Sequence, residues 1–182
     1  MAVLHPVCQC GRHTDRWVSF LTIQADSVTM HTDGRRTMSS IVEEWNAYPW
    51  MQWAGARLLF AADGKSRLEM RIADHHRGAA QTSAVNGAIL SYLHDIAQGA
   101  AVRTRTGEHS TVATISLTIH YIDLVHARDL LFVEGTAVRV GTGVGFAESS
   151  VRNDSGDICS TASGSFRVLR RRGAHTTGGA SA

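Results

Sequence analysis

The chain has 182 residues, 43% of them hydrophobic and 19% charged, which is enough to bury the core of one globular domain. Its formal net charge of +2 is too small to indicate a nucleic-acid partner or binding to a membrane surface. No apolar run is long enough to cross a bilayer, the first residues lack a signal-peptide pattern, and 3 cysteines do not build a disulfide framework, so we expect a reduced cytoplasmic protein.

We expect both ends of the chain to lie outside the folded domain, which then spans 38–169. Residues 1–37 hold one strand-like segment without a neighbouring partner, and Met30 or Met38 could be the true start, so they are expected to be a disordered leader or an over-long gene start. The cysteines and histidines at 5–13 lack the Cys-x₂₋₄-Cys spacing of structural zinc sites, and we predict no metal. The tail 170–182 is small, polar and glycine-rich and is expected to be disordered.

The N-terminal half of the domain is predicted to form a short helix, two strands and a long helix. Ser40 is followed three residues later by Glu43, a capping-box pattern for a helix that Pro49 ends. A hairpin and an apolar helix follow. The two strands are predicted at 56–62 and 66–73, and the long helix at about 85–101.

The C-terminal half is predicted to consist of strands separated by polar or glycine-rich turns. These strands are 111–122, 129–140, 144–153 and 158–169. One helix cannot cover both faces of such a sheet, so it must lie along one concave face. The order of elements therefore predicts an α+β hotdog fold, an antiparallel sheet wrapped around one long central helix.

Strand 111–122 has a clear alternation of apolar and polar residues. Its odd positions from Ala113 to Tyr121 are apolar, and its even positions from Thr114 to His120 are polar. We expect the odd residues to pack on the helix and the even residues to face away from it.

The long helix carries a carboxylate on a face that is otherwise apolar. Asp95 shares this face with Tyr92 and Gly99, whereas His94 and Gln98 are expected on the solvated side. A buried carboxylate is costly unless it is hydrogen-bonded or paired. Such groups gather at functional sites, so Asp95 is the first candidate for chemistry.

The segment VNGAILSYLHD (85–95) resembles the helix start of hotdog-fold acyl-CoA thioesterases of the phenylacetate-degradation type. That family has His-Gly-Gly followed seven residues later by Asp or Glu, where this chain has Asn86-Gly87-Ala88 and Asp95. The closing strands are also similar to the family, and the resemblance covers about 45–169.

The resemblance implies a role for each of four residues. Asp95 would be a general base on water or a nucleophile on the thioester carbonyl. The Gly87 N–H would stabilise the oxyanion, and the Asn86 amide would point at the same oxygen. Thr114 would hold the attacking water from a neighbouring subunit, which implies a homodimer or a dimer of dimers.

The predicted function is hydrolysis of an acyl-CoA or aryl-CoA to a free acid and CoA. Coenzyme A is part of the substrate, and no metal, redox cofactor, nucleic acid or membrane is implied. The residues predicted to contact the substrate are His76, Tyr92, Arg103, Arg139 and Arg167.

Two other functions are compatible with the sequence. Asn86 and Ala88 depart from the family pattern, so the chain could be a non-catalytic acyl-CoA-binding protein. A hotdog dehydratase or hydratase is the second, and it would need a histidine at the helix start, where this chain has Asn86.

Overall fold

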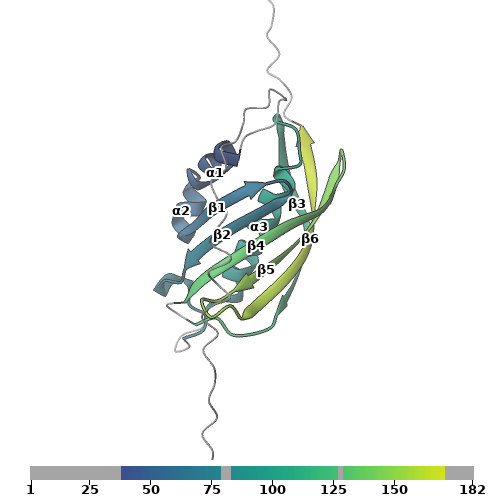
Figure 1. The fold of residues 1–182 in the computed structure, drawn as a ribbon. Coiled ribbons are helices and arrows are strands. Elements are labelled where there is room, and N and C mark those ends of the chain that lie inside the picture. Colours follow the sequence, from purple (N-terminus) through teal and green to yellow (C-terminus); the bar gives the residue numbers. More distant parts are fainter. Residues whose placement is uncertain (1–37, 79–82, 127–128, 171–182) are drawn as a thin grey trace, which may run out of the picture. The chain divides into compact units, whose positions relative to one another are not determined.

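A computed structural model describes residues 38–78, 83–126 and 129–170, so the predictions for 1–37 and for 171–182 of the tail lie outside the described residues (Figure 1). Arg170, which was predicted to belong to the tail, is the last residue of the last strand. The helices are α1 (Met38–Asn46), α2 (Pro49–Ala54) and α3 (Gly87–Arg103), with a short 3₁₀ turn at Asp74–His76. The strands are β1 (Ala56–Ala62), β2 (Lys65–Arg71), β3 (Ser110–Tyr121), β4 (Leu130–Val140), β5 (Val144–Arg152) and β6 (Ile158–Arg170).

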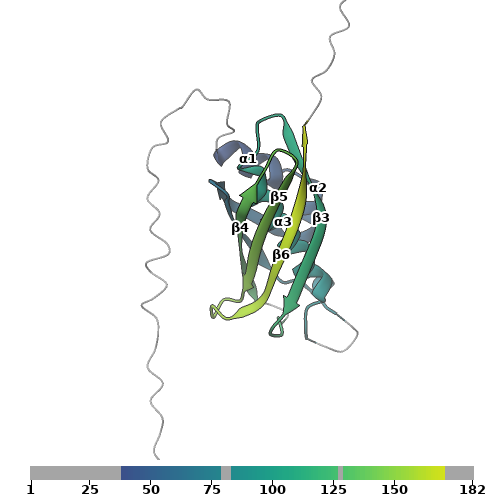
Figure 2. The ribbon, with the colours of Figure 1, turned by 90° about the vertical axis from the view of Figure 1, so that its right-hand side faces the viewer.

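The six strands form one antiparallel sheet in the order β1-β2-β4-β5-β6-β3. Figure 2 shows β4, β5, β6 and β3 in front of α3, which packs along the inner face of the sheet. This arrangement confirms the predicted hotdog fold, and each predicted strand and the long helix agree with the structure to within two or three residues.

The core lies where α3 crosses the sheet at close range. Leu93, Ala97 and Ala100 of α3 are fully buried. Below them, a Cβ atom on Gly135 of β4 would lie 2.5 Å from the Ala97 carbonyl oxygen, so only glycine allows this approach. Ser66 of β2 donates a hydrogen bond to the same carbonyl at 2.7 Å. Small residues therefore set the depth at which the helix is buried.

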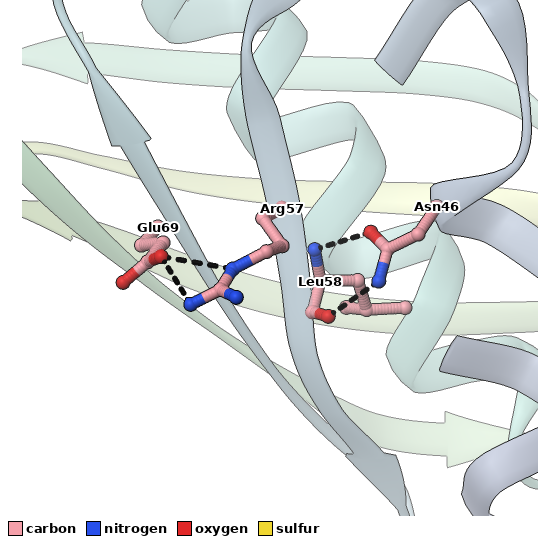
Figure 3. Close-up of polar contacts among 4 residues, drawn as sticks. All are labelled: Asn46, Arg57, Leu58 and Glu69. Carbon is pink, nitrogen blue, oxygen red and sulfur yellow. Dashed lines mark hydrogen bonds and ion pairs between the residues drawn. The ribbon is translucent and has the colours of Figure 1, made fainter. Parts of the chain in front are cut away.

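The region around Pro49 differs from the prediction. The first helix ends at Asn46, and Pro49 opens a second helix, α2, because the first turn of a helix tolerates a residue without an N–H. The Asn46 side chain bonds both the N–H and the C=O of Leu58 at 2.9 Å, which ties the end of α1 to β1 (Figure 3). Arg57 and Glu69 form a cross-strand ion pair at 2.7 Å beside it.

The alternation predicted for β3 is correct over only part of the strand. Two residues of β3 lie opposite one residue of β6 between Thr114 and Ser116, so Ile115 is an extra residue in a β-bulge. The bulge reverses the phase, because Thr114 pairs with the buried Phe166. Residues before Ile115 therefore face the helix at even positions, and those after it at odd positions.

His94 and Gln98 are buried, so their predicted position on a solvated helix side was wrong. His94 bonds Ser149 Oγ through Nδ1 at 2.7 Å and Ser160 Oγ through Nε2 at 2.8 Å, and Gln98 donates to Ser149 at 2.7 Å. These hydroxyls from β5 and β6 give the helix polar partners inside the core. Burial lowers the pKa of His94 from 6.5 to about 4.

This buried histidine predicts a loss of stability in mild acid. The unfolded chain binds a proton at His94 as pH falls below about 6.5, while the folded chain binds it only near pH 4, so the free energy of unfolding falls across this window. The shift corresponds to about 3 kcal/mol. Urea unfolding between pH 7 and pH 4 measures it.

The matched variant is His94→Gln, which keeps a polar side chain but does not titrate. We expect its unfolding free energy to depend less on pH than that of the wild type. Equal pH dependence in the two proteins would show that His94 is not the titrating group.

Candidate active site

Asp95 is half-buried near the middle of α3 and is held by one hydrogen bond. Thr114 Oγ1 of β3 donates to Asp95 Oδ1 at 2.5 Å, within the same chain. The β3 bulge makes this contact possible, because it turns Thr114 toward the helix. No other partner of the carboxylate is found among the described residues, so its second oxygen can accept a bond from water.

The structure brings Asp95 and Thr114 together, as their shared assignment to the active site predicts, but within one chain. The resemblance implied a threonine from a neighbouring subunit, whereas the structure forms the pair inside one chain. Thr114 orients the carboxylate through a short charge-assisted bond.

Asp95 and Thr114 lie in the wall of a cavity of about 320 Å³. One side of the cavity is α3, a second is β3, and the third is formed by α1 and α2. The principal lining side chains are Trp45, Tyr48, Trp50, Tyr92, Asp95, Ile96, Arg103, Val112, Thr114 and Phe166.

The α1–α2 wall is aromatic, and sequence reasoning missed it. Trp50 stacks on Tyr48 with ring centroids 5.2 Å apart and meets Trp45 edge-on at 5.9 Å. It also meets Tyr92 of α3 edge-on at 6.2 Å. The signal was present, since three tryptophans and a tyrosine fall within residues 45–53.

Tyr92, which was predicted to contact the substrate, lines the cavity. Its hydroxyl donates to the Trp50 carbonyl oxygen at 2.7 Å, which joins α3 to α2. Burial, and secondly the charge of Asp95, raise the pKa of Tyr92 above its usual value, so the hydroxyl stays protonated as a donor at neutral pH.

The start of α3 is built around Asn86 and Gly87. Asn86 is the N-cap, and its Oδ1 accepts the Ala88 N–H at 3.0 Å, so this oxygen serves the helix itself. Tyr121 Oη donates to the Gly87 carbonyl at 3.1 Å and contacts Ser91 Oγ at 2.8 Å. A Cβ atom on Gly87 would lie 3.2 Å from the Tyr121 ring, so a larger residue would push the ring aside.

Gly87 and Asp95 stand eight residues apart on one straight helix. This spacing separates them by about 12 Å along the axis. An oxyanion donor and a base must both lie about 3 Å from the reacting groups. The two residues of one chain therefore cannot act on the same carbonyl.

Two of the residues predicted to contact the substrate, His76 and Arg103, are buried and hydrogen-bonded within the chain. His76 is 1% exposed, and its Nδ1 accepts the Ala73 N–H at 2.9 Å. Burial, and secondly His75, lower the pKa of His76. Arg103 is 5% exposed and lines the cavity, but its guanidinium donates to Thr106 Oγ1 at 2.7 Å and to two backbone carbonyls of the loop after α3.

Arg139 and Arg167 lie on the opposite side of the sheet from the cavity. Arg139 follows the bulge at Val138 and pairs with the exposed Phe146, and Arg167 follows the inward-facing Phe166, so the two arginines project from the outer face. Arg139 and Arg167 were predicted to contact the substrate, and within one chain the structure does not bring them to the cavity of Asp95.

A second groove, of about 560 Å³, lies at the end of the sheet. Its basic side chains are Arg105, His109 and Arg170, and Glu108 is its one carboxylate. Ser110 lines both this groove and the cavity of Asp95, so the two adjoin.

Within 38–78, 83–126 and 129–170, no group of three or more His, Cys, Asp or Glu side chains is arranged to hold a metal ion. Among these residues, no helix is both long and apolar enough to span a membrane.

Comparison with known proteins places this chain near one family. The model of the thioesterase superfamily matches residues 82–160. A Halobacterium salinarum protein, provisionally named an esterase, is 36% identical over 132 residues, which cover 66% of this chain and 84% of that protein.

Solved structures share the fold. The phenylacetic acid degradation protein PaaI of Thermus thermophilus, as an N33D mutant, superposes with a TM-score of 0.59 at 18% identity, covering 66% of this chain and 98% of that one. A Streptococcus mutans protein bound to acetyl-CoA gives a TM-score of 0.57 at 16% identity, covering 63% and 90%.

The position of Arg103 predicts that it stabilises the protein. Arg103→Met removes the donated hydrogen bonds of a buried guanidinium to Thr106 Oγ1 and to the Gly107 and Glu108 carbonyls, so we expect the free energy of unfolding to fall by about 2–4 kcal/mol. The exposed Arg71→Met should change it by less than about 0.5 kcal/mol. Urea unfolding measures both, and equal effects would contradict a structural role for Arg103.

Proposed function

Because this chain belongs to the thioesterase superfamily, we propose that it hydrolyses acyl-CoA thioesters with Asp95 as its catalytic carboxylate. The observation that carries the proposal is the Asp95–Thr114 pair in the wall of an aromatic cavity. It gives a carboxylate of fixed orientation beside a space that can hold an acyl group.

In the proposed reaction, water attacks the thioester carbonyl while Asp95 takes its proton. The C–S bond then breaks, and the sulfur of CoA leaves with a proton. A direct attack by Asp95, with hydrolysis of the resulting anhydride by water, uses the same residue. Neither route uses a metal or a redox cofactor.

The negative charge on the carbonyl oxygen needs a donor, and Gly87 N–H is the candidate. As the first residue of α3, it lies at the positive end of the helix dipole, where backbone N–H groups lack helical partners. The spacing of about 12 Å from Asp95 then requires Gly87 from a second copy. The proposed enzyme is therefore a homodimer with composite sites.

The edge strand β3 favours such a dimer. It pairs with β6 on one side only, so its other side offers unpaired backbone groups to a second copy. Thr114 lies on this strand, and Tyr121 at its end contacts Gly87.

The acyl group is proposed to lie in the cavity beside Trp50 and Tyr92. Edge-to-face and stacked rings favour a flat aromatic group over a long flexible chain. The volume of about 320 Å³ also favours a compact group. An aryl-CoA is thus the proposed substrate class.

The phosphates of CoA are proposed to lie in the second groove. Arg105 and Arg170 supply guanidinium groups suited to phosphate, although Glu108 opposes them. Asp95 lies eight residues, about 12 Å, before the end of α3, and Arg105 follows that end, which suits the extended arm between the sulfur and the phosphates of CoA. The acetyl-CoA held by the Streptococcus mutans neighbour supports a CoA ligand.

The second candidate is an acyl-CoA-binding protein without activity. The capping bond of Asn86, in the place of the family's histidine, favours it, because that side chain is occupied by the helix.

We expect the wild type to release CoA from aryl-CoA substrates faster than from long-chain acyl-CoA. Asp95→Asn should lower kcat by at least about a hundredfold, because a positioned base is lost. Thiol release over a panel of short, long and aromatic acyl-CoAs measures both. Asp123→Asn, on an exposed carboxylate outside the cavity, is the matched control.

Binding of the same acyl-CoAs by calorimetry separates the two candidates. Binding without turnover would favour the inactive binder. Turnover that survives Asp95→Asn would refute the role of Asp95 while leaving the activity in place.

A further inference from the structure

Tyr121 ends β3 beside the first turn of α3, and the reaction proposed above gives it no task. Its side chain is 55% exposed, yet its hydroxyl contacts two groups of the helix. Oη donates to the Gly87 carbonyl oxygen at 3.1 Å and lies 2.8 Å from Ser91 Oγ. A hydroxyl on so exposed a side chain can bond water, so these contacts are not needed to satisfy it. They hold the side chain against the start of α3.

The hydroxyls of Tyr121 and Ser91 form a short chain over the Gly87 carbonyl. Ser91 Oγ also lies 3.1 Å from this oxygen. Each hydroxyl has one proton to donate, so the chain runs from one hydroxyl to the other and ends on the carbonyl. Either order links Tyr121 to Gly87, directly or through Ser91.

The ring of Tyr121 packs on Gly87 as well. A Cβ atom at this position would lie 3.2 Å from the nearest ring carbon, so the ring lies against the glycine itself. Tyr121 therefore holds Gly87 at two points, the Cα atom and the carbonyl oxygen. A glycine needs such restraint more than other residues, because it has the widest conformational freedom.

The cap of α3 leaves the Gly87 N–H open. Asn86 Oδ1 accepts the Ala88 N–H at 3.0 Å, and the Asn86 carbonyl accepts the Ile89 N–H at 2.9 Å. The Gly87 N–H has no acceptor among the described residues. A donor stabilises a developing oxyanion best when it already points at the right place before the reaction. What holds Gly87 thus decides how well this N–H can serve.

We propose that Tyr121 is a positioning residue of the oxyanion site, which holds Gly87 so that its N–H faces the thioester carbonyl oxygen. The inference rests on the proposed function, in which this N–H stabilises the oxyanion. Strand β3 then positions both halves of the machinery, since its Thr114 orients Asp95. In the proposed dimer, Tyr121 acts in the site that takes Gly87 from its own chain.

Steady-state hydrolysis by the full chain, on the aryl-CoA that it turns over fastest, tests this role. Tyr121→Phe keeps the ring and removes the hydroxyl. We expect kcat to fall about tenfold with KM unchanged, a smaller loss than that of an oxyanion donor itself. Ser116→Ala removes an exposed, hydrogen-bonded hydroxyl from the same strand and should keep the wild-type kcat. The urea midpoint of Tyr121→Phe should shift no more than that of this control.

The kinetic outcomes separate the inference from the function on which it rests. Wild-type kcat in Tyr121→Phe, or a change confined to KM, would overturn the positioning role while the hydrolase stands. No turnover of any acyl-CoA by the wild type would remove the proposed function, and this inference with it.

Subunit mixing shows which site Tyr121 serves. Exchange between Tyr121→Phe and Asp95→Asn forms sites with Asp95 from one chain and an intact Gly87–Tyr121 pair from the other, so activity should rise to about a quarter of that of the wild type. Exchange with Gly87→Pro forms no intact site, and activity should not rise. Recovery in the mixture of Asp95→Asn and Gly87→Pro, but not in that of Asp95→Asn and Tyr121→Phe, would overturn the role of Tyr121 alone.

Discussion

The whole fold depends on one helix filling the inner face of a six-stranded sheet. In the described part of the chain, α3 packs against β4, β5, β2, β6 and β3, so each side of this helix must meet a different surface. Ala97 approaches β4 so closely that only Gly135 fits below it. This close packing of α3 on the sheet determines which of its side chains are buried. His94 is forced into the core, while Asp95, one residue further along, reaches the cavity.

His94 and Asp95 find their hydrogen-bonding partners in different ways. Each is polar on a largely buried helix, so each needs a hydrogen-bonding partner. His94 is neutral and bonded by serines on both ring nitrogens, which makes it structural. Asp95 has one hydrogen-bond partner among the described residues, Thr114, and lines the cavity. A carboxylate that is oriented yet still able to accept a proton is what hydrolysis requires.

Much of the fold was predictable from the sequence, because turns and alternation mark strands and apolar spacing marks a helix. Which residues of β3 face the helix could not be predicted. The bulge at Ile115 arises from pairing with β6, and nothing in the sequence of β3 itself marks it. His94 was misplaced because periodicity alone cannot tell that the far side of the helix is covered as well. The aromatic wall was missed because Trp45 and Trp50 reach the cavity only through the way that α1 and α2 fold back beside α3. Arg139 and Arg167 were assigned from charge alone, and strand register puts them on the outer face.

The central claim is that one active site takes Asp95 from one chain and Gly87 from another, and subunit mixing tests it most directly. Asp95→Asn removes the base, and Gly87→Pro removes the N–H at the first residue of α3, where helices accept proline and where the added ring displaces the Tyr121 side chain. Each variant alone should be inactive. After random exchange of subunits, half of the dimers are mixed and carry one intact site, so about a quarter of wild-type activity should return. No recovery after exchange that is itself demonstrated by mass would contradict the composite site.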